Sequence, residues 1–233
     1  MKFTQEQLDK YNAIREDSLV FKCSDGLCLV KNSDEAVEKF NELVSIDLDL
    51  LEYNKISYAY LLNDQAKVID VIKIVLLEEY FVVLHSDNDV VRAWLKDNLE
   101  EFLAEENNLY SELLGVEGPY AWRLLKEVFG YEITGLQYLR VISLDLEEHS
   151  FTVLRESISG EYGYKILMSK DAYGVLAQKL EESEELKIKS IENLDKTLQN
   201  ILGAEVRIPL MDSFFKENSC PVENETRWLI DFN

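Results

Sequence analysis

Proline and glycine are scarce in this chain, with 3 and 9 among 233 residues. Flexible linkers are usually rich in such residues, so we expect no linker that separates independent domains. No apolar run is long enough to span a bilayer, and the N-terminus lacks the apolar stretch of a signal peptide. These absences favour a cytoplasmic protein that does not enter a membrane.

Cysteine and histidine are also rare, with three and two residues. An odd, low cysteine count argues against a secreted disulfide scaffold, and no Cys or His spacing resembles a zinc site, so we expect no metal. Cys23 and Cys28 flank an Asp25-Gly26 pair, which favours a two-residue hairpin turn. We therefore expect a hairpin over 19–31 with the cysteines facing each other, as reduced thiols rather than a disulfide in the cytoplasm.

Positive charge is in short supply, because 24 basic residues stand against 45 acidic ones and the net charge is −21. Such a field repels phosphate backbones and anionic lipids, so nucleic acid and membrane surfaces are excluded as expected partners. Solubility alone explains an acidic surface of this kind.

The apolar periodicity predicts helices alternating with mostly antiparallel strands. Thr4 with Gln7 forms a predicted capping box, and Ser33 is the predicted cap of the second helix. The expected helices cover 4–16, 33–44, 87–104, 119–129, 171–182 and 189–201. The expected strands cover 19–23, 27–31, 57–62, 68–77, 80–85, 109–116, 138–146, 150–156 and 163–169.

This pattern predicts an α+β fold with helices packed on one face of each sheet. With 47% hydrophobic residues the chain can bury a sizeable core. We expect one domain over residues 1–233, with two intimately packed halves, about 1–106 and 107–233, as the alternative.

The most informative motif is the stretch Arg155–Lys165, read as a strand end, a glycine-containing turn and a second strand. It resembles the R-x-x-Y-T-G-E-x-G-Y/F-E signature of the folate-binding domain of the glycine-cleavage T-protein (aminomethyltransferase) family. Three further stretches resemble that family in its own order: Ile56–Asp70, Val116–Ala121, and Leu202–Ala204 followed by Cys220–Glu223 and Trp228.

The resemblance implies a T-protein-like folate-binding domain with antiparallel sheets, flanking helices and a ferredoxin-like substructure. The resemblance ends where the family continues into its C-terminal β-barrel domain, so we expect that domain to be absent. We therefore expect a freestanding folate-domain homologue, similar in kind to the gamma subunit of heterotetrameric sarcosine oxidase.

The resemblance also implies tetrahydrofolate as cofactor and transfer of a one-carbon unit as chemistry. It identifies six positions as cofactor-binding candidates: Tyr58, Asn88, Arg155, Glu161, Tyr164 and Lys165. The family has glutamate where this chain has Lys165, and that glutamate accepts N–H groups of the pterin ring. An ammonium can only donate, so folate binding in the family's pose is disfavoured.

The family's Asp-Asp pair is incomplete. Asp70 matches its first member, whereas the second member, which assists proton movement at the reacting amine, is Val71. A valine cannot accept a proton. One hypothesis assigns a replacement acid–base role to Asp70 and His85 beside Tyr58; the other, which we favour for His85, is a strand-end histidine hydrogen-bonded to its neighbours.

Two functions follow as hypotheses. The first is an accessory or interaction subunit in one-carbon or amine metabolism with a degenerate folate site, which binds a protein partner or a second copy near Trp228. The alternative is an active tetrahydrofolate-dependent one-carbon transferase that uses Asp70 and His85. The tRNA-modification branch is disfavoured by the charge and by the absence of its K-G-C-Y-x-G-Q-E-like motif, and a relic domain without ligand stays open.

Overall fold

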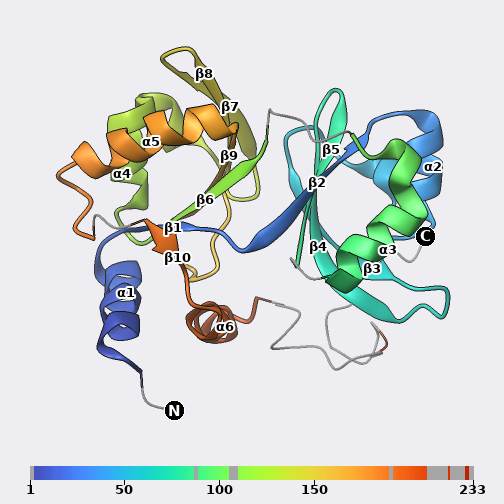
Figure 1. Cartoon of the computed structure of the whole chain (residues 1–233), viewed down its shortest axis with the longest axis horizontal. Coiled ribbons are helices and arrows are strands. Elements are labelled where there is room, and N and C mark those ends of the chain that lie inside the picture. Colours follow the sequence, from blue (N-terminus) through green and yellow to red (C-terminus); the bar gives the residue numbers. More distant parts are fainter. Residues whose placement is uncertain are drawn as a thin grey trace. The chain divides into compact units, whose positions relative to one another are not determined.

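The computed structural model describes residues 3–86, 89–104, 110–188, 191–208, 220 and 229–230. They form two compact units (Figure 1), each with its own sheet. The first unit comprises residues 1–23 and 106–208, and the second comprises 24–105 and 209–233. The units interleave along the chain, so a division into consecutive halves near residue 106 does not describe them.

The first unit is built on a six-stranded sheet with the order β10-β1-β6-β9-β8-β7. Its strands are β1 (Leu19–Lys22), β6 (Glu112–Glu117), β7 (Val141–Leu146), β8 (His149–Leu154), β9 (Gly163–Met168) and β10 (Glu192–Asn193). All neighbours are antiparallel except β1 and β10, which run parallel. The loop between β8 and β9 therefore leaves the middle of the sheet.

Helices contact both faces of this larger sheet. Helices α4 (Ala121–Phe129) and α5 (Lys170–Glu182) pack with Val20 of β1, whereas α1 (Gln5–Glu16) and α6 (Lys196–Glu205) pack with Leu19 and Phe21. Successive strand residues point to opposite faces, so a strand that is apolar at every position is buried on both sides. The prediction of helices on one face only is wrong for this sheet.

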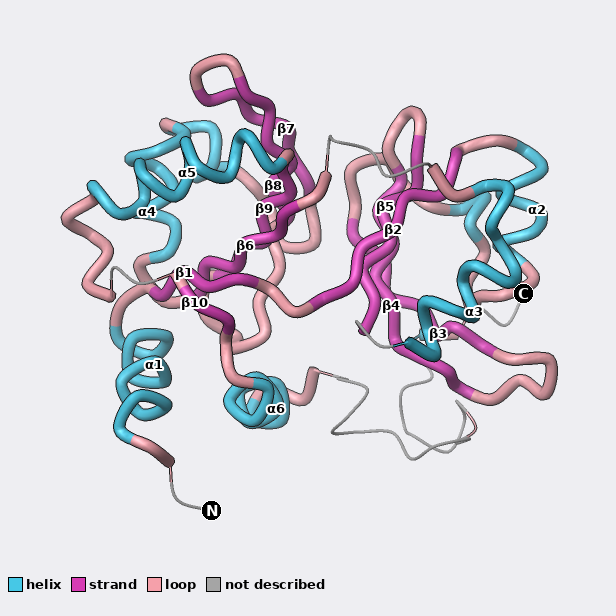
Figure 2. Tube along the Cα trace, viewed as in Figure 1, coloured by secondary structure: helices cyan, strands magenta, loops and turns pink. Residues whose placement is uncertain are grey.

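The second unit is built on a four-stranded antiparallel sheet with the order β2-β5-β4-β3. Its strands are β2 (Asp25–Lys31), β3 (Ile56–Leu62), β4 (Val68–Leu76) and β5 (Tyr80–Ser86). Helices α2 (Asp34–Asn41) and α3 (Asp89–Leu99) lie beside this sheet (Figure 2). Side chains of both helices share one apolar cluster with the strands. Among the described residues, short 3₁₀ helices cover Leu48–Leu50 and Glu100–Phe102 in this unit and Tyr131–Gly135 in the first unit.

Several local predictions are confirmed. Thr4 and Gln7 form the capping box of α1, and the Ser33 hydroxyl accepts a hydrogen bond from the N–H of Ala36 at the start of α2. Strands β7 and β8 pair as the predicted hairpin. Local signals suffice at these places because both partners of each interaction lie within a few residues of each other.

The predicted hairpin over 19–31 is wrong. Asp25 and Gly26 do not form a turn but belong to β2, where they pair with Ser86 and His85 of β5. A Cβ atom on Gly26 would lie 2.2 Å from His85 Cε1, so this glycine makes room for a ring rather than for a turn. Cys23 follows β1 of the larger sheet and Cys28 lies in β2 of the smaller one, so they do not face each other across a turn, and none of the three cysteines, which all lie in the described part of the chain, forms a disulfide.

The predicted helix over 189–201 is also wrong at its start. Glu192 and Asn193 pair with Phe21 and Lys22 of β1 as the short strand β10. Asp195 then caps α6, because its carboxylate accepts the N–H of Leu198. The apolar pattern predicted one continuous helix, whereas the pairing of β10 with β1 and the cap at Asp195 divide this segment into a strand and a shorter helix. Residues 221–228, including Trp228, and Asn88 lie outside the described residues.

Within the described ranges no helix combines the length and the apolarity that a bilayer crossing requires. The same residues contain no group of three or more His, Cys, Asp or Glu side chains arranged to hold a metal ion.

Substitution of Gly115 in β6 would test how tightly the side chains on the larger sheet are packed. A Cβ atom there would lie 2.4 Å from Cζ of Phe21, whereas a Cβ atom on Gly174 in α5 would meet nothing within 4 Å. We expect Gly115→Ala to lower the free energy of unfolding by roughly 1–3 kcal/mol through overpacking. The matched control Gly174→Ala should raise it by about 0.5–1 kcal/mol, because alanine favours helix. Urea denaturation measures both; equal stability of the two variants would contradict this account of the packing.

Candidate functional site

The motif Arg155–Lys165 forms the β8–β9 connection and the first residues of β9. β8 ends at Leu154, β9 begins at Gly163, and residues 155–162 form a loop, named here the signature loop. The loop contains Gly160 with φ +80°, a backbone conformation that glycine adopts without steric cost. A Cβ atom there would lie 2.7 Å from Cγ1 of Val206, so the loop approaches the segment after α6 closely.

A buried carboxylate organises the signature loop. Glu117, at the end of β6, accepts hydrogen bonds from Ser157 Oγ (2.7 Å), Ser159 Oγ (2.6 Å) and the N–H of Ile158 (3.0 Å). Burial raises the pKa of Glu117 to about 7, although these three hydrogen bonds act in the opposite direction. Burial thus favours the protonated, neutral form of this carboxyl group.

Gly163 provides the space for this carboxylate. It pairs with Glu117 across β6 and β9, and a Cβ atom on it would lie 2.4 Å from Glu117 Oε1 and from the carbonyl oxygen of Glu156. Only glycine lets the Glu117 carboxylate approach the backbone this closely, so the second glycine of the motif has a packing role.

The hydroxyl groups of the two serines also accept hydrogen bonds from the backbone of the loop. Ser157 Oγ accepts the N–H groups of Ser159 (3.1 Å) and Gly160 (3.0 Å), and Ser159 Oγ accepts the N–H of Glu161 (3.2 Å). From α1, Arg15 donates to the carbonyl oxygen of Ser159 (2.7 Å) and pairs with Glu161 at 3.5 Å. Most polar groups of the loop are therefore held within the unit.

Arg155 is fixed at the start of the loop. Its Nη1 donates to the carbonyl oxygen of Gly163 (3.0 Å), and the centre of its guanidinium lies 4.5 Å and 4.7 Å from the ring centroids of Tyr162 and Tyr164. Tyr164 is almost fully buried in the core and Tyr162 is exposed. The cation is thus oriented by two aromatic rings and one carbonyl group.

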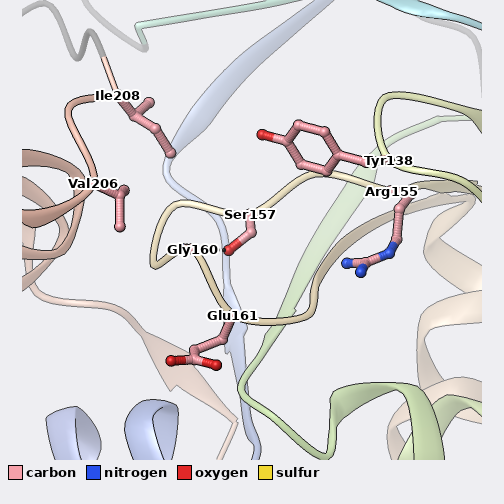
Figure 3. A pocket seen from close by; sticks show the side chains of 7 residues that line it. All are labelled: Tyr138, Arg155, Ser157, Gly160, Glu161, Val206 and Ile208. Atoms are coloured by element: carbon pink, nitrogen blue, oxygen red, sulfur yellow. Dashed lines mark hydrogen bonds between the residues drawn. The ribbon is translucent and has the colours of Figure 1, made fainter.

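An open pocket of about 400 Å³ lies beside the signature loop. Figure 3 shows the seven residues that line it: Tyr138, Arg155, Ser157, Gly160, Glu161, Val206 and Ile208. Of the predicted cofactor-binding residues, Arg155 and Glu161 line this pocket. Tyr138, Val206 and Ile208 were not predicted as site residues, because they come from segments far apart in the sequence and carry no motif.

Lys165 does not line the pocket. Its ammonium group pairs with Glu156 at 3.1 Å, and the two side chains are only 7% and 1% exposed. The family signature predicts a pterin acceptor at this position. The structure instead places a cation there whose charge is already balanced by an adjacent residue of the same motif.

Asp70 and His85 lie in the second unit. The Asp70 carboxylate accepts the N–H and the hydroxyl of Ser86, each at 2.7 Å, and the N–H of Val71 at 2.9 Å. Burial raises the pKa of Asp70, although these hydrogen bonds and the charge of nearby His85 act against the increase. These contacts tie β4 to β5, which is a structural role for the carboxylate.

His85 is buried, and its Nδ1 lies 2.8 Å from the carbonyl oxygen of Ser86. Tyr58 pairs with Lys73 across β3 and β4 and belongs to a different apolar cluster from Leu61, the strand partner of Asp70. Because residues three apart on a strand point to opposite faces, Tyr58 does not join Asp70. Asp70 and His85 are thus brought together, but without the tyrosine.

The proton of Glu117 should appear in the pH dependence of stability. Its pKa is about 7 in the folded chain and 4.5 in the reference state, so its contribution to stability is present below pH 4.5 and is lost as the pH rises through 7. Glu117→Gln removes this titration. Relative to wild type, the variant should therefore gain roughly 3 kcal/mol between pH 4.5 and pH 8.

Urea denaturation of both proteins at the two pH values measures this change. The control is Glu132→Gln, because the Glu132 side chain is exposed on a 3₁₀ helix, and its effect on stability should be equal at both pH values. A Glu117→Gln effect that is independent of pH would contradict the assignment.

The buried Lys165–Glu156 ion pair should also contribute to stability in a way that can be measured. Lys165→Met removes the cation that faces a buried carboxylate, so the free energy of unfolding should fall by about 3–5 kcal/mol. Glu156→Leu combined with Lys165→Met removes both charges and should recover most of that loss. Thermal and urea denaturation compare the variants; a double variant no more stable than Lys165→Met would show that packing, not charge, decides.

Comparisons with known proteins agree with this architecture. A model of the GCVT N-terminal domain matches residues 4–233. Aminomethyltransferase of Francisella tularensis subsp. tularensis (strain SCHU S4 / Schu 4) is 28% identical over 171 residues, 70% of this chain and 46% of that protein. Aminomethyltransferase of Halothermothrix orenii is 21% identical over 232 residues, 97% of this chain and 64% of that protein.

A solved structure shows the same fold. Glycine cleavage system aminomethyltransferase T from Bartonella henselae superimposes with a TM-score of 0.79 at 21% identity, covering 97% of this chain and 61% of that one. The chain thus spans between about half and two thirds of the relatives that it matches. Since the family model covers nearly the whole chain, the chain belongs to the GCVT N-terminal domain family.

Proposed function

We propose that this chain is an aminomethyltransferase-family protein whose tetrahydrofolate site is degenerate, and that it acts as an accessory or interaction subunit in one-carbon or amine metabolism. Family membership supplies the context. The observation that carries the proposal is the buried ion pair between Lys165 and Glu156.

The ion pair bears directly on folate recognition. In the T-protein signature the residue at position 165 is a glutamate that accepts N–H groups of the pterin. Here an ammonium occupies the position, and a carboxylate 3.1 Å away satisfies its charge. A pterin bound in the family's pose would have to break this pair. Its N–H donors would then face the N–H donors of the Lys165 ammonium, and burying these donors without acceptors costs their full desolvation penalty.

Asp70 and Val71 of the second unit also support a degenerate site. Val71 takes the place of the catalytic aspartate, and the oxygens of Asp70 accept three hydrogen bonds from Ser86 and Val71. These hydrogen bonds occupy lone pairs of the carboxylate that a substrate would otherwise use, although burial raises the pKa of Asp70. As an interaction subunit the chain would bind another protein or a second copy, and light scattering of the purified chain tests the second possibility.

Isothermal titration calorimetry with tetrahydrofolate tests the folate site. We expect a Kd weaker than about 100 μM for the wild type, because the pterin edge lacks its acceptor. Glu156→Gln combined with Lys165→Glu restores a carboxylate without placing two buried charges side by side, and should bind at least about tenfold more tightly. Glu156→Gln alone is the matched control, since it alters the pair but supplies no acceptor at position 165.

A wild-type Kd in the low micromolar range would sink the degenerate-site proposal. Aminomethyl transfer by the wild type that disappears in Asp70→Asn or His85→Ala would instead favour the active one-carbon transferase. In that case Asp70 and His85 of the second unit, which interact electrostatically, would be the place to look for its chemistry.

A further inference from the structure

The pocket beside the signature loop is built from strained backbone. Leu139 (φ +61°) follows the lining residue Tyr138, and Arg207 (φ +59°) lies between the lining residues Val206 and Ile208. Residues with a Cβ atom rarely adopt this left-handed conformation, and such outliers cluster at ligand sites. Two separate walls of one pocket thus share the same unusual feature.

The surrounding structure holds both strained turns in place. The N–H of Leu139 donates to the carbonyl oxygen of Arg155 (2.8 Å), and the N–H of Ile208 donates to that of Gly203 (2.9 Å). The first bond couples the Tyr138 turn directly to the residue that carries the positive charge of the pocket. The geometry therefore presents Tyr138 and Arg155 together.

Arg155 offers hydrogen-bond donors to this space. A guanidinium group has five N–H donors, and among the described residues the hydrogen bond from Nη1 to Gly163 is the one that Arg155 makes through its side chain. In Figure 3 the guanidinium lies across the pocket from Val206 and Ile208, whereas the Glu161 carboxylate points away from it. Glu161 is in turn paired with Arg15.

The remaining lining residues are Ser157, Gly160 and Glu161 of the signature loop, together with one aromatic and two aliphatic side chains. Val206 and Ile208 supply aliphatic surface, and the Tyr138 side chain is 55% exposed. One oriented cation beside an apolar surface, in a hollow of about 400 Å³, matches the general make-up of small-molecule sites. We propose that this pocket binds a small organic acid, whose carboxylate pairs with Arg155 and whose apolar body lies against Tyr138, Val206 and Ile208.

Benzoate is a suitable probe, because it combines a carboxylate with a flat apolar ring. Titration of the full chain, followed by NMR chemical shifts, should show saturable binding with a Kd on the order of 1 mM, as expected for a ligand of so few atoms. Benzamide has the same shape without the charge and should bind at least about tenfold more weakly, since the charge-assisted hydrogen bonds to Arg155 are lost.

Two variants locate the binding. Arg155→Gln should weaken benzoate binding about tenfold or more, and Arg123→Gln, which changes an exposed arginine of α4 outside the pocket, should leave the affinity unchanged. Tyr138→Ala should weaken binding several-fold, and its exposed position means that the fold should be retained. If Arg155→Gln fails to fold, the affinity of Tyr138→Ala for benzoate shows whether the ligand binds in this pocket.

Three results would overturn the proposal. They are the absence of saturable shifts up to about 20 mM benzoate, twenty times the expected Kd, equal affinity for benzamide, and wild-type affinity in the folded Arg155→Gln or Tyr138→Ala variant. The folate titration uses a different ligand and different substitutions, so either proposal can fail without the other.

Discussion

Glu117 accepts hydrogen bonds from two serine hydroxyls and one backbone N–H of the signature loop, at a position with almost no solvent exposure. The arrangement depends on Gly163, because any side chain on the facing strand would occupy the space of the carboxylate. The loop in turn forms one wall of the pocket. A single buried acid on β6 thus determines the shape of the candidate site, and burial sets its pKa near neutrality.

Within the same motif, the residues that shape the backbone differ from those that the family signature assigns to ligand binding. Its glycines serve backbone geometry, which any member of the fold needs. Its charged residues form ion pairs within the unit, since Lys165 pairs with Glu156 of the motif and Glu161 pairs with Arg15 of α1. A motif can therefore keep the fold that it encodes after the ligand contacts have changed, because packing and recognition depend on different atoms.

In the second unit the Asp70 carboxylate plays a comparable part. The two hydrogen bonds from Ser86 join β4 to β5, and the bond from Val71 is local to β4. Buried polar groups of this kind are costly unless fully satisfied. Such a residue is retained for stability whether or not it takes part in catalysis. The proposed organic-acid pocket would give the chain a ligand of its own in either role, as an interaction subunit or as an enzyme.

The sequence by itself determined the α+β class, most helix and strand positions, the caps at Thr4 and Ser33, and the family. These depend on contacts within a few residues, or on motifs read as strings. Only the tertiary structure decided that Asp25-Gly26 is a strand, since the reason is the His85 ring facing it from another strand. The ion pair of Lys165, the role of Glu117 and the pocket were likewise decided by side chains that meet through sheet register and loop packing, which no local pattern in one sequence records.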